Sequence, residues 1–496
     1  MIEFLIILPV IIPFFTGAVL IATMKSRDIS RTISLASAFL LLVSSLILFA
    51  VVWLSGIKVL YVGSWKAPFG ISFIADIFSV SMLVMTAVML ILVTIYSFAS
   101  IDSGREKYGF WVFLQFMIMG VCGSFLTGDI FNLFVWFEVM LMSSFVLIAL
   151  GNEKFQLEGA VKYVTINVIS SVLFLSAVGI LYGLTGSLNM ADLSGKIKLV
   201  ENKYLINIAA LFFLTSFGIK AAIFPLFFWL PASYPTPPIP VTSIFSALLT
   251  KVGVFALIRI FTIVFIHNVP FTHGILLALA GLTMVTGVLG AAAQFEFRRI
   301  LAFHIVSQIG YLLLGLGLFT LNGLAATVFF FFHIMLAKTN LFFISGIVNR
   351  IYGSYDLNRL GGIYKNHPFI SIMFMISAGS LAGIPPFPGF WAKLFVIKAA
   401  FESHYYFIGA VAILVSILTL YSMLKIWNEA FWKNIEHPDT KEEKLTNKFG
   451  WYVPVIIVSV LMILISVFPE HVYIISQKAS EQILNSAVYI KNVIGK

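Results

Sequence analysis

Long apolar runs separated by short polar stretches make up most of this 496-residue sequence. Many of these runs are close to 20 residues long, about the length that an α-helix needs to cross a bilayer. The pattern predicts an all-α polytopic membrane protein of about 14 transmembrane helices, forming a single transmembrane domain over residues 1–496. The predicted helices lie near residues 2–23, 31–54, 72–99, 109–127, 128–150, 161–185, 205–230, 241–267, 271–293, 299–319, 321–348, 367–400, 404–431 and 451–469.

The composition agrees with this pattern, because 60% of the residues are hydrophobic and only 10% are charged. Soluble globular domains carry about 25% charged residues. The first apolar run has no basic segment before it, and Lys25, Arg27 and Arg31 follow it. This order favours a first spanning helix with its N-terminus outside over a cleaved signal peptide.

The basic residues of the loops predict the orientation. Loops on one side hold about twice as many Lys and Arg residues as those on the other, which makes the richer side cytoplasmic. Both termini of this multi-pass protein then face outward from the cell membrane. Residues 432–450 are predicted to form a cytoplasmic loop, and the weakly amphipathic residues 470–496 a segment on the outer face. The net charge of +10 does not indicate nucleic-acid binding, since no basic run with interleaved aromatic residues occurs.

Two proline-interrupted apolar helices, the predicted spans 7 and 12, suggest an internal duplication. The seventh carries Lys220 and then Pro225, and the twelfth carries Lys393 after its own prolines. Paired broken helices in corresponding halves are typical of inverted-repeat transporters. The sequence thus predicts two inverted five-helix repeats, residues 109–267 (spans 4–8) and 271–431 (spans 9–13). The predicted helix-breaking residues are Pro225, Pro385, Pro386 and Pro388.

Several ionisable residues lie deep within the predicted spans. They are Glu138, Lys220, Lys251, His304, His333, Lys338 and Lys393. One buried ion pair could serve only to hold helices together, but a buried pair often fails to repay its desolvation. Charges spread over six spans therefore favour a proton relay. Arg259, Lys398 and Lys425 lie nearer to span ends, where a long side chain can reach the membrane interface.

The chemistry of these residue types suits protons. Burial lowers the pKa of a lysine and a neighbouring carboxylate raises it, so a lysine such as Lys220 beside Glu138 can act as a switchable proton store. Histidines titrate near neutrality and can bridge the halves. Phosphate-binding, zinc-hydrolase and serine-hydrolase motifs are absent from the sequence, and Cys122 is its single cysteine. We therefore expect no cofactor and no metal, and we interpret Asp76 and Asp129 as structural or interfacial acids.

The stretch FPLFFWLPASYPTPPIPVTSIFSALLTKVGVFALIR (224–259) resembles the signature of the proton-translocating antiporter-like family. That family includes the large antiporter-like subunits of respiratory complex I, membrane-bound hydrogenases and the Mrp cation/proton antiporters. The segments GDIFNLFVWFE (128–138), RRILAFHIVSQIG (298–310) and GFWAKLFVIKA (389–399) look most similar to the D subunits of the Mrp antiporters. Relatives in complex I usually carry His and Asp in the loop where this chain has Phe227, Ala232 and Tyr234.

The resemblance implies roles for the matching positions. Glu138 and Lys220 would form the coupled pair of a first half-channel, and Lys251 would pass the proton toward the centre. His304, His333 and Lys338 would be intermediate stations. Lys393 would be the terminal station of the second half-channel.

Three hypotheses about function follow. The leading one is a non-enzymatic subunit of a multi-subunit Na⁺ (or K⁺)/H⁺ antiporter that carries the proton path and whose partners are the other Mrp subunits. The second is a proton-pumping subunit of a redox-driven complex of hydrogenase or NADH dehydrogenase type. The third is a polytopic membrane transferase, which the mid-membrane position of the charges disfavours. The exchanged cation, the stoichiometry and the cation route stay open at this point.

Overall fold

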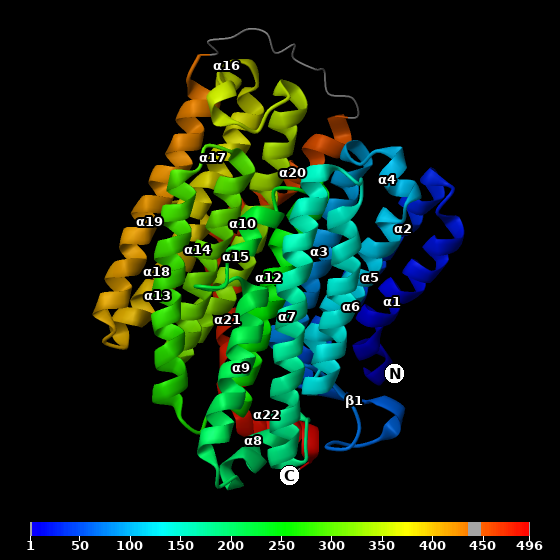
Figure 1. The fold of residues 1–496 in the computed structure, drawn as a ribbon, viewed down its shortest axis with the longest axis vertical. Helices are drawn as coiled ribbons and strands as arrows, with labels where there is room; N and C mark the ends of the chain where they lie inside the picture. Colours follow the sequence, from blue (N-terminus) through cyan, green and yellow to red (C-terminus); the bar gives the residue numbers. More distant parts are fainter. Residues whose placement is uncertain (1, 435–447, 496) are drawn as a thin grey trace.

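The computed structural model describes residues 2–434 and 448–495, and Figure 1 shows them as a tall bundle of helices. Helices dominate because in lipid every backbone polar group must be satisfied within its own segment. The elements are α1 (Ile2–Thr23), α2 (Arg27–Ser55), β1 (Lys58–Tyr61), η1 (Val62–Ser64), β2 (Ser72–Ala75), α3 (Ile77–Ser100), α4 (Ser103–Lys107), α5 (Phe110–Leu126), α6 (Ile130–Ala149), α7 (Lys154–Thr185), α8 (Met190–Leu199), α9 (Lys203–Ala221), α10 (Trp229–Ser233), α11 (Ile239–Ile244), η2 (Phe245–Leu249), α12 (Thr250–Arg259), η3 (Ile260–Val264), α13 (Val269–Ala293), α14 (Phe297–Leu318), α15 (Leu321–Tyr352), η4 (Leu357–Arg359), α16 (Ile363–Asn366), α17 (Pro368–Ala382), α18 (Pro388–Glu402), α19 (Tyr406–Ile426), η5 (Trp427–Trp432), α20 (Lys448–Val467), α21 (Pro469–Leu484) and α22 (Ser486–Ile494).

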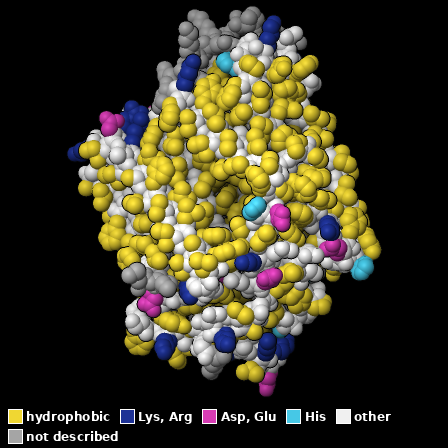
Figure 2. Space-filling model, turned by 180° about the vertical axis from the view of Figure 1, so that it is seen from behind, with side chains coloured by type: hydrophobic (Ala, Val, Ile, Leu, Met, Phe, Trp, Pro, Cys, Tyr) yellow, Lys and Arg dark blue, Asp and Glu magenta, His cyan; other side chains and the backbone are white. Residues whose placement is uncertain are grey.

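Within the described residues, 12 helices are long and apolar enough to cross a membrane. Two shorter apolar helices, α5 and α17, also pack in the bundle. The predicted all-α polytopic fold is confirmed, while the number of 14 crossings and the inverted repeats stay predictions. Figure 2 shows hydrophobic side chains over most of one face, with the charged side chains mainly toward its top and in its lower half.

Four elements form the centre of the bundle. The helices α3, α14 and α15, together with the continuous stretch from α11 to η3, are almost wholly buried, whereas α1, α2, α7, α13, α19 and α20 expose many apolar side chains. The exposed apolar side chains suit contact with lipid tails or with other membrane helices. The buried ionisable residues on the inner helices are therefore shielded from lipid.

The predicted span over residues 72–99 is wrong at its start. Residues 72–75 form strand β2, which pairs antiparallel with β1, with Lys58 opposite Ala75. Helix α3 begins only at Ile77, because the Asp76 carboxylate accepts a hydrogen bond from the Ser79 amide at its N-terminus. Hydropathy alone includes the apolar strand in the helix, because it carries no information about the Asp76 cap that starts α3.

Both proline-rich spans are interrupted in the structure. Helix α9 ends at Ala221 and Ala222 has a φ of 60°, so the chain leaves the helix before Pro225 and becomes helical again at α10. Helix α17 ends at Ala382, Gly383 has a φ of 87°, and α18 begins at Pro388. Glycine adopts this left-handed conformation without strain. Two helix ends therefore lie inside the bundle.

The C-terminal helices return to the bundle. Ser480 Oγ of α21 donates to the Leu321 carbonyl at 2.8 Å, and the Ile77 amide donates to Gln482 Oε1 at 2.8 Å. The Tyr61 hydroxyl donates to the Val493 carbonyl of α22. In Figure 1 both termini lie toward one end of the bundle, and α4 and α16 lie toward the other. Most of the predicted loop at 432–450, residues 435–447, lies outside the described residues.

Candidate functional site

Glu138 on α6 and Lys220 on α9 are near one another, without a direct bond. Lys220 Nζ lies 5.2 Å from the centroid of the Phe137 ring and interacts electrostatically with Glu138. The half-buried Glu138 carboxylate accepts a hydrogen bond from Ser171 Oγ of α7. Lys220 Nζ is buried and has no hydrogen-bond partner among the described residues. A lysine that is not locked by protein partners is free to bond to water.

Lys251 lies on the fully buried α12, directly after a π-helical turn. Its Nζ donates to the Ser246 carbonyl within η2 at 2.5 Å, and Thr250 Oγ1 lies 3.4 Å away. A π-helical turn interrupts the regular backbone ladder, and such turns are frequent at functional sites. Gly253 lets α12 approach the end of α9, because a Cβ there would lie 3.1 Å from the Lys220 carbonyl carbon. Lys251 is therefore close to the first broken helix.

Lys338 and His304 are buried between α14, α15 and α19. Lys338 Nζ donates to the Leu301 carbonyl at 3.0 Å, and His304 Nε2 lies 2.8 Å from Ser422 Oγ. The other ring nitrogen of His304 has no partner among the described residues. Each group thus makes one bond to the protein and keeps further hydrogen-bonding capacity.

His333 and Lys393 lie at the second broken helix. His333 Nδ1 is 3.1 Å from Ser380 Oγ at the end of α17, and its Nε2 has no partner among the described residues. Lys393 Nζ on α18 donates to the Ala382 carbonyl at 3.0 Å and lies 5.1 Å from the Tyr311 ring centroid. The carbonyl of Ala382 is available because α17 ends there. The helix break thus creates the binding partner of Lys393.

The predicted ionisable series lies inside the bundle in two electrostatically linked groups, Glu138 with Lys220, and Lys338 with Lys251, Lys393, His304 and His333. Lys338 interacts electrostatically with both Lys251 and Lys393. His304 and His333 each interact with both Lys338 and Lys393. The described residues provide no direct hydrogen bond between any two of these groups, so transfer between them requires water or side-chain motion.

Sequence reasoning missed the partners of these groups and one buried ion pair. Ser171, Ser380 and Ser422 come from other helices, and no sequence spacing links them to the residues that they contact. Arg259 is only 5% exposed and pairs with Asp76, so the prediction that it reaches the interface is wrong. The pair forms because α12 ends against the start of α3, which hydropathy does not reveal. As predicted for structural acids, Asp76 and Asp129 cap α3 and α6.

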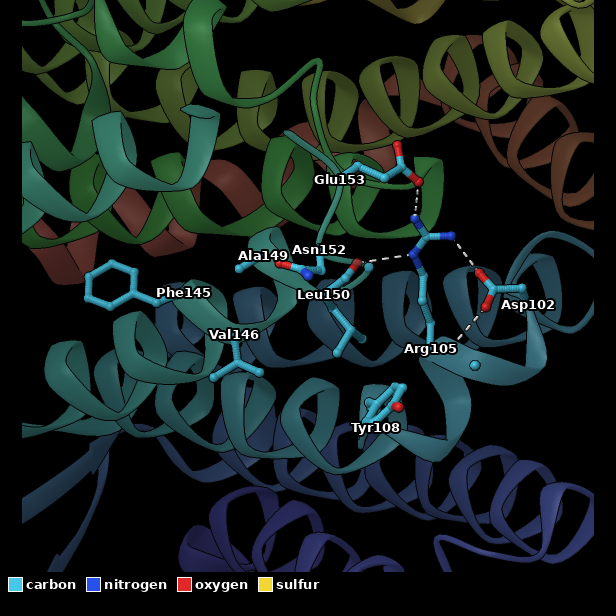
Figure 3. A pocket seen from close by; sticks show the side chains of 11 residues that line it. Asp102, Arg105, Tyr108, Phe145, Val146, Ala149, Leu150, Asn152 and Glu153 are labelled. Atoms are coloured by element: carbon cyan, nitrogen blue, oxygen red, sulfur yellow. Dashed lines mark hydrogen bonds and ion pairs between the residues drawn. The ribbon is translucent and has the colours of Figure 1, made fainter. Parts of the chain in front are cut away.

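A cavity of about 760 Å³ lies away from this series, between α4 and the turn that joins α6 to α7 (Figure 3). Arg105 crosses it and pairs with Asp102 and Glu153. Burial alone would raise the pKa of Asp102, but hydrogen bonds from Arg105 outweigh it and hold that pKa below its usual value. The described residues contain no group of three or more His, Cys, Asp or Glu side chains that could hold a metal. The ion pairs of Arg105 therefore stabilise this cavity, which lies between the short helix α4 and the α6–α7 turn.

The fold and the site define a polytopic membrane protein of the transporter type, with ionisable groups inside a bundle that contains two broken helices. The family model described as "NADH:quinone oxidoreductase/Mrp antiporter, TM" matches residues 127–419, and the chain belongs to this family. Along almost its whole length it is similar to the D subunits of Na⁺/H⁺ antiporters.

Two curated relatives and one solved structure show the extent of the similarity. The chain is 44% identical to the Na⁺/H⁺ antiporter D subunit of Alkalihalophilus pseudofirmus, over 99% of both chains. It is 39% identical to the corresponding D subunit of Bacillus subtilis, again over 99% of both. A chain of the Mrp complex from Dietzia sp. DQ12-45-1b superimposes with a TM-score of 0.93 and 30% identity, covering 99% of each chain. The family resemblance seen in the sequence is confirmed.

Proposed function

We propose that this chain is the proton-translocating subunit of a multi-subunit Na⁺ (or K⁺)/H⁺ antiporter in the cell membrane. The observation that carries the proposal is the position of Lys338, which interacts with Lys251 of the first broken-helix region and with Lys393 of the second. Lysines of α12, α15 and α18 thus occupy the buried centre, where charges are expensive and usually functional, and this supports the proposal. The relatives named as antiporter D subunits match the chain from end to end.

In the proposed route a proton moves between the Glu138–Lys220 pair, Lys251, Lys338 and Lys393, with His304 and His333 as intermediates. Each lysine uses at most two of its three N–H groups on the protein, which leaves donors for water. Residues 109–267 and 271–431 would be the two halves of this route, and both termini would face outward. The chain would act as a secondary transporter subunit and not as an enzyme.

The partner subunits are part of the proposal. The described residues contain no group of three or more His, Cys, Asp or Glu side chains that could hold a metal ion, and an antiporter must couple two ions. We therefore assign the cation path, or part of it, to other Mrp subunits packed against the apolar flanks. The alternative is a subunit of a redox-driven proton pump. Subunits that co-purify with the chain distinguish the two, because only the second needs iron–sulfur or nickel proteins.

The test is a pair of alanine variants, Glu138→Ala and Lys220→Ala, in the assembled complex. Each should abolish sodium-dependent dissipation of a pH gradient in everted vesicles while the complex still assembles. Lys398→Ala is the matched control, because Lys398 is exposed and its pair with Glu402 lies at the surface. Near-normal exchange by either variant, at normal expression, would contradict the proposed route.

A further inference from the structure

A row of buried polar side chains descends along one face of α7. Gln156, Tyr163, Asn167 and Ser170 lie at spacings of seven, four and three residues, which places them on one side of the helix. All four are at most 2% exposed, so they face neighbouring helices and not lipid. Polar groups in such positions are costly in a membrane and commonly mark a path for ions or protons.

The lower part of this row reaches the first broken helix. Ser170 Oγ donates to the Ser216 carbonyl at 2.8 Å, and the two serine hydroxyls are 3.1 Å apart. Ser216 lies one helical turn before Lys220 on α9. The row therefore ends beside an ionisable group of the proposed route.

Tyr163 lies in the middle of this row, and its hydroxyl oxygen is free to accept a hydrogen bond. Its hydroxyl oxygen is 2.9 Å from Ser144 Oγ, and Ser144 itself donates to the Leu141 carbonyl. Because a serine hydroxyl has a single proton, Tyr163 is the donor in this pair. Its oxygen can then accept a hydrogen bond from another group.

Tyr234 faces the same region from the segment after α10. Its ring packs 5.6 Å from Trp229 and 5.7 Å from Phe245, and the Tyr163 ring packs against the same two side chains at 5.3 and 6.1 Å. The next residue after Phe245 is Ser246, whose carbonyl accepts the Lys251 ammonium. The rings of Tyr163 and Tyr234 therefore pack against the same two side chains, beside the residue whose carbonyl binds Lys251.

The hydroxyl of Tyr234 has no protein partner in the described part of the chain, although the residue is wholly buried. The same is true of Ser233 Oγ and Ser243 Oγ, which flank it on α10 and α11. Burying a hydroxyl without a hydrogen bond is costly, and ordered water is the usual partner of such groups. A buried phenol without a protein partner, with two such serine hydroxyls on the same connected segments, favours ordered water in this region over a fully packed apolar core.

We propose that Tyr163 and Tyr234 line a hydrated proton entrance leading to Lys251 from the end of the bundle that carries α4. Figure 1 shows α10 in the half of the bundle toward that end. The Tyr234 hydroxyl would accept one hydrogen bond and donate another, so a proton passes along water to Lys251 and Tyr234 ends with the proton that it began with. Tyr163, whose proton is held by Ser144, would only accept a hydrogen bond from that water and position it. This entrance rests on the proposed proton route and adds residues to it.

The test uses Tyr234→Phe and Tyr163→Phe in the full complex, since each removes one oxygen atom and keeps the ring. We expect Tyr234→Phe to lower proton-coupled exchange by about 100-fold or more, the range for losing a positioned proton-transfer group. Tyr234→His should restore a large part of it, because an imidazole both donates and accepts. Tyr96→Phe is the control, as its buried hydroxyl bonds to the Phe343 carbonyl on α15, away from this region.

The outcomes separate the possibilities. If the role of Tyr234 is purely structural, Tyr234→Phe should be harmless, because loss of its hydroxyl breaks no hydrogen bond to the described protein residues. Wild-type exchange by Tyr234→Phe would therefore overturn the inference. If Tyr163→Phe fails to assemble because the Ser144 contact is lost, Tyr234→Phe alone decides. A wild-type complex without proton-coupled exchange would refute the proposed function itself, whatever the tyrosine variants do.

Discussion

The buried ion pair between Asp76 and Arg259 offers a quantitative test of how the bundle is held together. Asp76 is 1% exposed and Arg259 is 5% exposed. The Arg259 guanidinium also lies 5.0 Å from the Phe255 ring centroid and 5.6 Å from that of Phe78. The pair joins the start of α3 to the end of α12, the helix that carries Lys251.

Asp76→Asn isolates the charge from the helix cap. Asparagine caps a helix about as well as aspartate, so α3 keeps its N-terminal acceptor. Arg259 would then remain buried without its counter-ion, which typically costs about 3–5 kcal/mol. Asp76→Ala also removes the cap and should cost about 1 kcal/mol more.

The assay is the melting temperature of the purified complex in detergent. Unfolding entropy is about 2.1 cal/mol/K per residue, so a chain of 496 residues should lose about 1 °C per kcal/mol. We expect Asp76→Asn to melt about 3–5 °C lower, given that cost of the unpaired charge. Glu153→Gln is the control, because it breaks an exposed pair with Arg105 worth about 0–1 kcal/mol.

A double variant sharpens the test. Asp76→Asn with Arg259→Met removes both charges and should recover most of the loss, since no buried charge is then left without its counter-ion. The reasoning is refuted if Asp76→Asn melts within about 1 °C of the wild type, the shift expected for a surface pair. It is also refuted if the double variant loses more melting temperature than Asp76→Asn and Arg259→Met lose in sum.

Three further predictions concern the route and the assembly. Lys393→Ala should lose proton-coupled exchange, and Lys393→Arg should assemble yet also fail, because arginine keeps its proton in a protein; an active arginine variant would indicate a fixed structural charge. Gly389→Ala should misassemble or lose activity, because a Cβ there would collide with the Ser380 carbonyl oxygen and lie 2.8 Å from His333 Cε1. Gly179→Ala is the control: a Cβ at that position meets nothing within 4 Å, so this variant should be tolerated in assembly and exchange assays. Finally, the chain expressed alone in a strain without its own Na⁺/H⁺ antiporters should not restore salt tolerance; growth and sodium-dependent proton flux by this chain alone would remove the need for partners.

The class of fold and most of the ionisable series could be predicted from the amino-acid sequence. Runs of apolar residues are long enough to specify membrane helices because lipid offers no partner to the backbone. Charged residues such as Lys251 and Lys338 are conspicuous in those runs because they are costly there. The interruptions near Pro225 and Pro388 could also be predicted, because proline lacks the backbone N–H and clashes with the preceding turn, which kinks or breaks a helix.

What each buried group contacts depends on how the helices pack in three dimensions. The Asp76–Arg259 pair, the Ser171 bond to Glu138 and the Ala382 carbonyl beneath Lys393 all join segments that the chain topology brings together. Hydropathy measures the preference of a segment for lipid, and it contains no term for which helix lies beside which. It therefore predicted that Arg259 would reach the membrane interface, whereas packing of α12 against α3 buries it with a carboxylate.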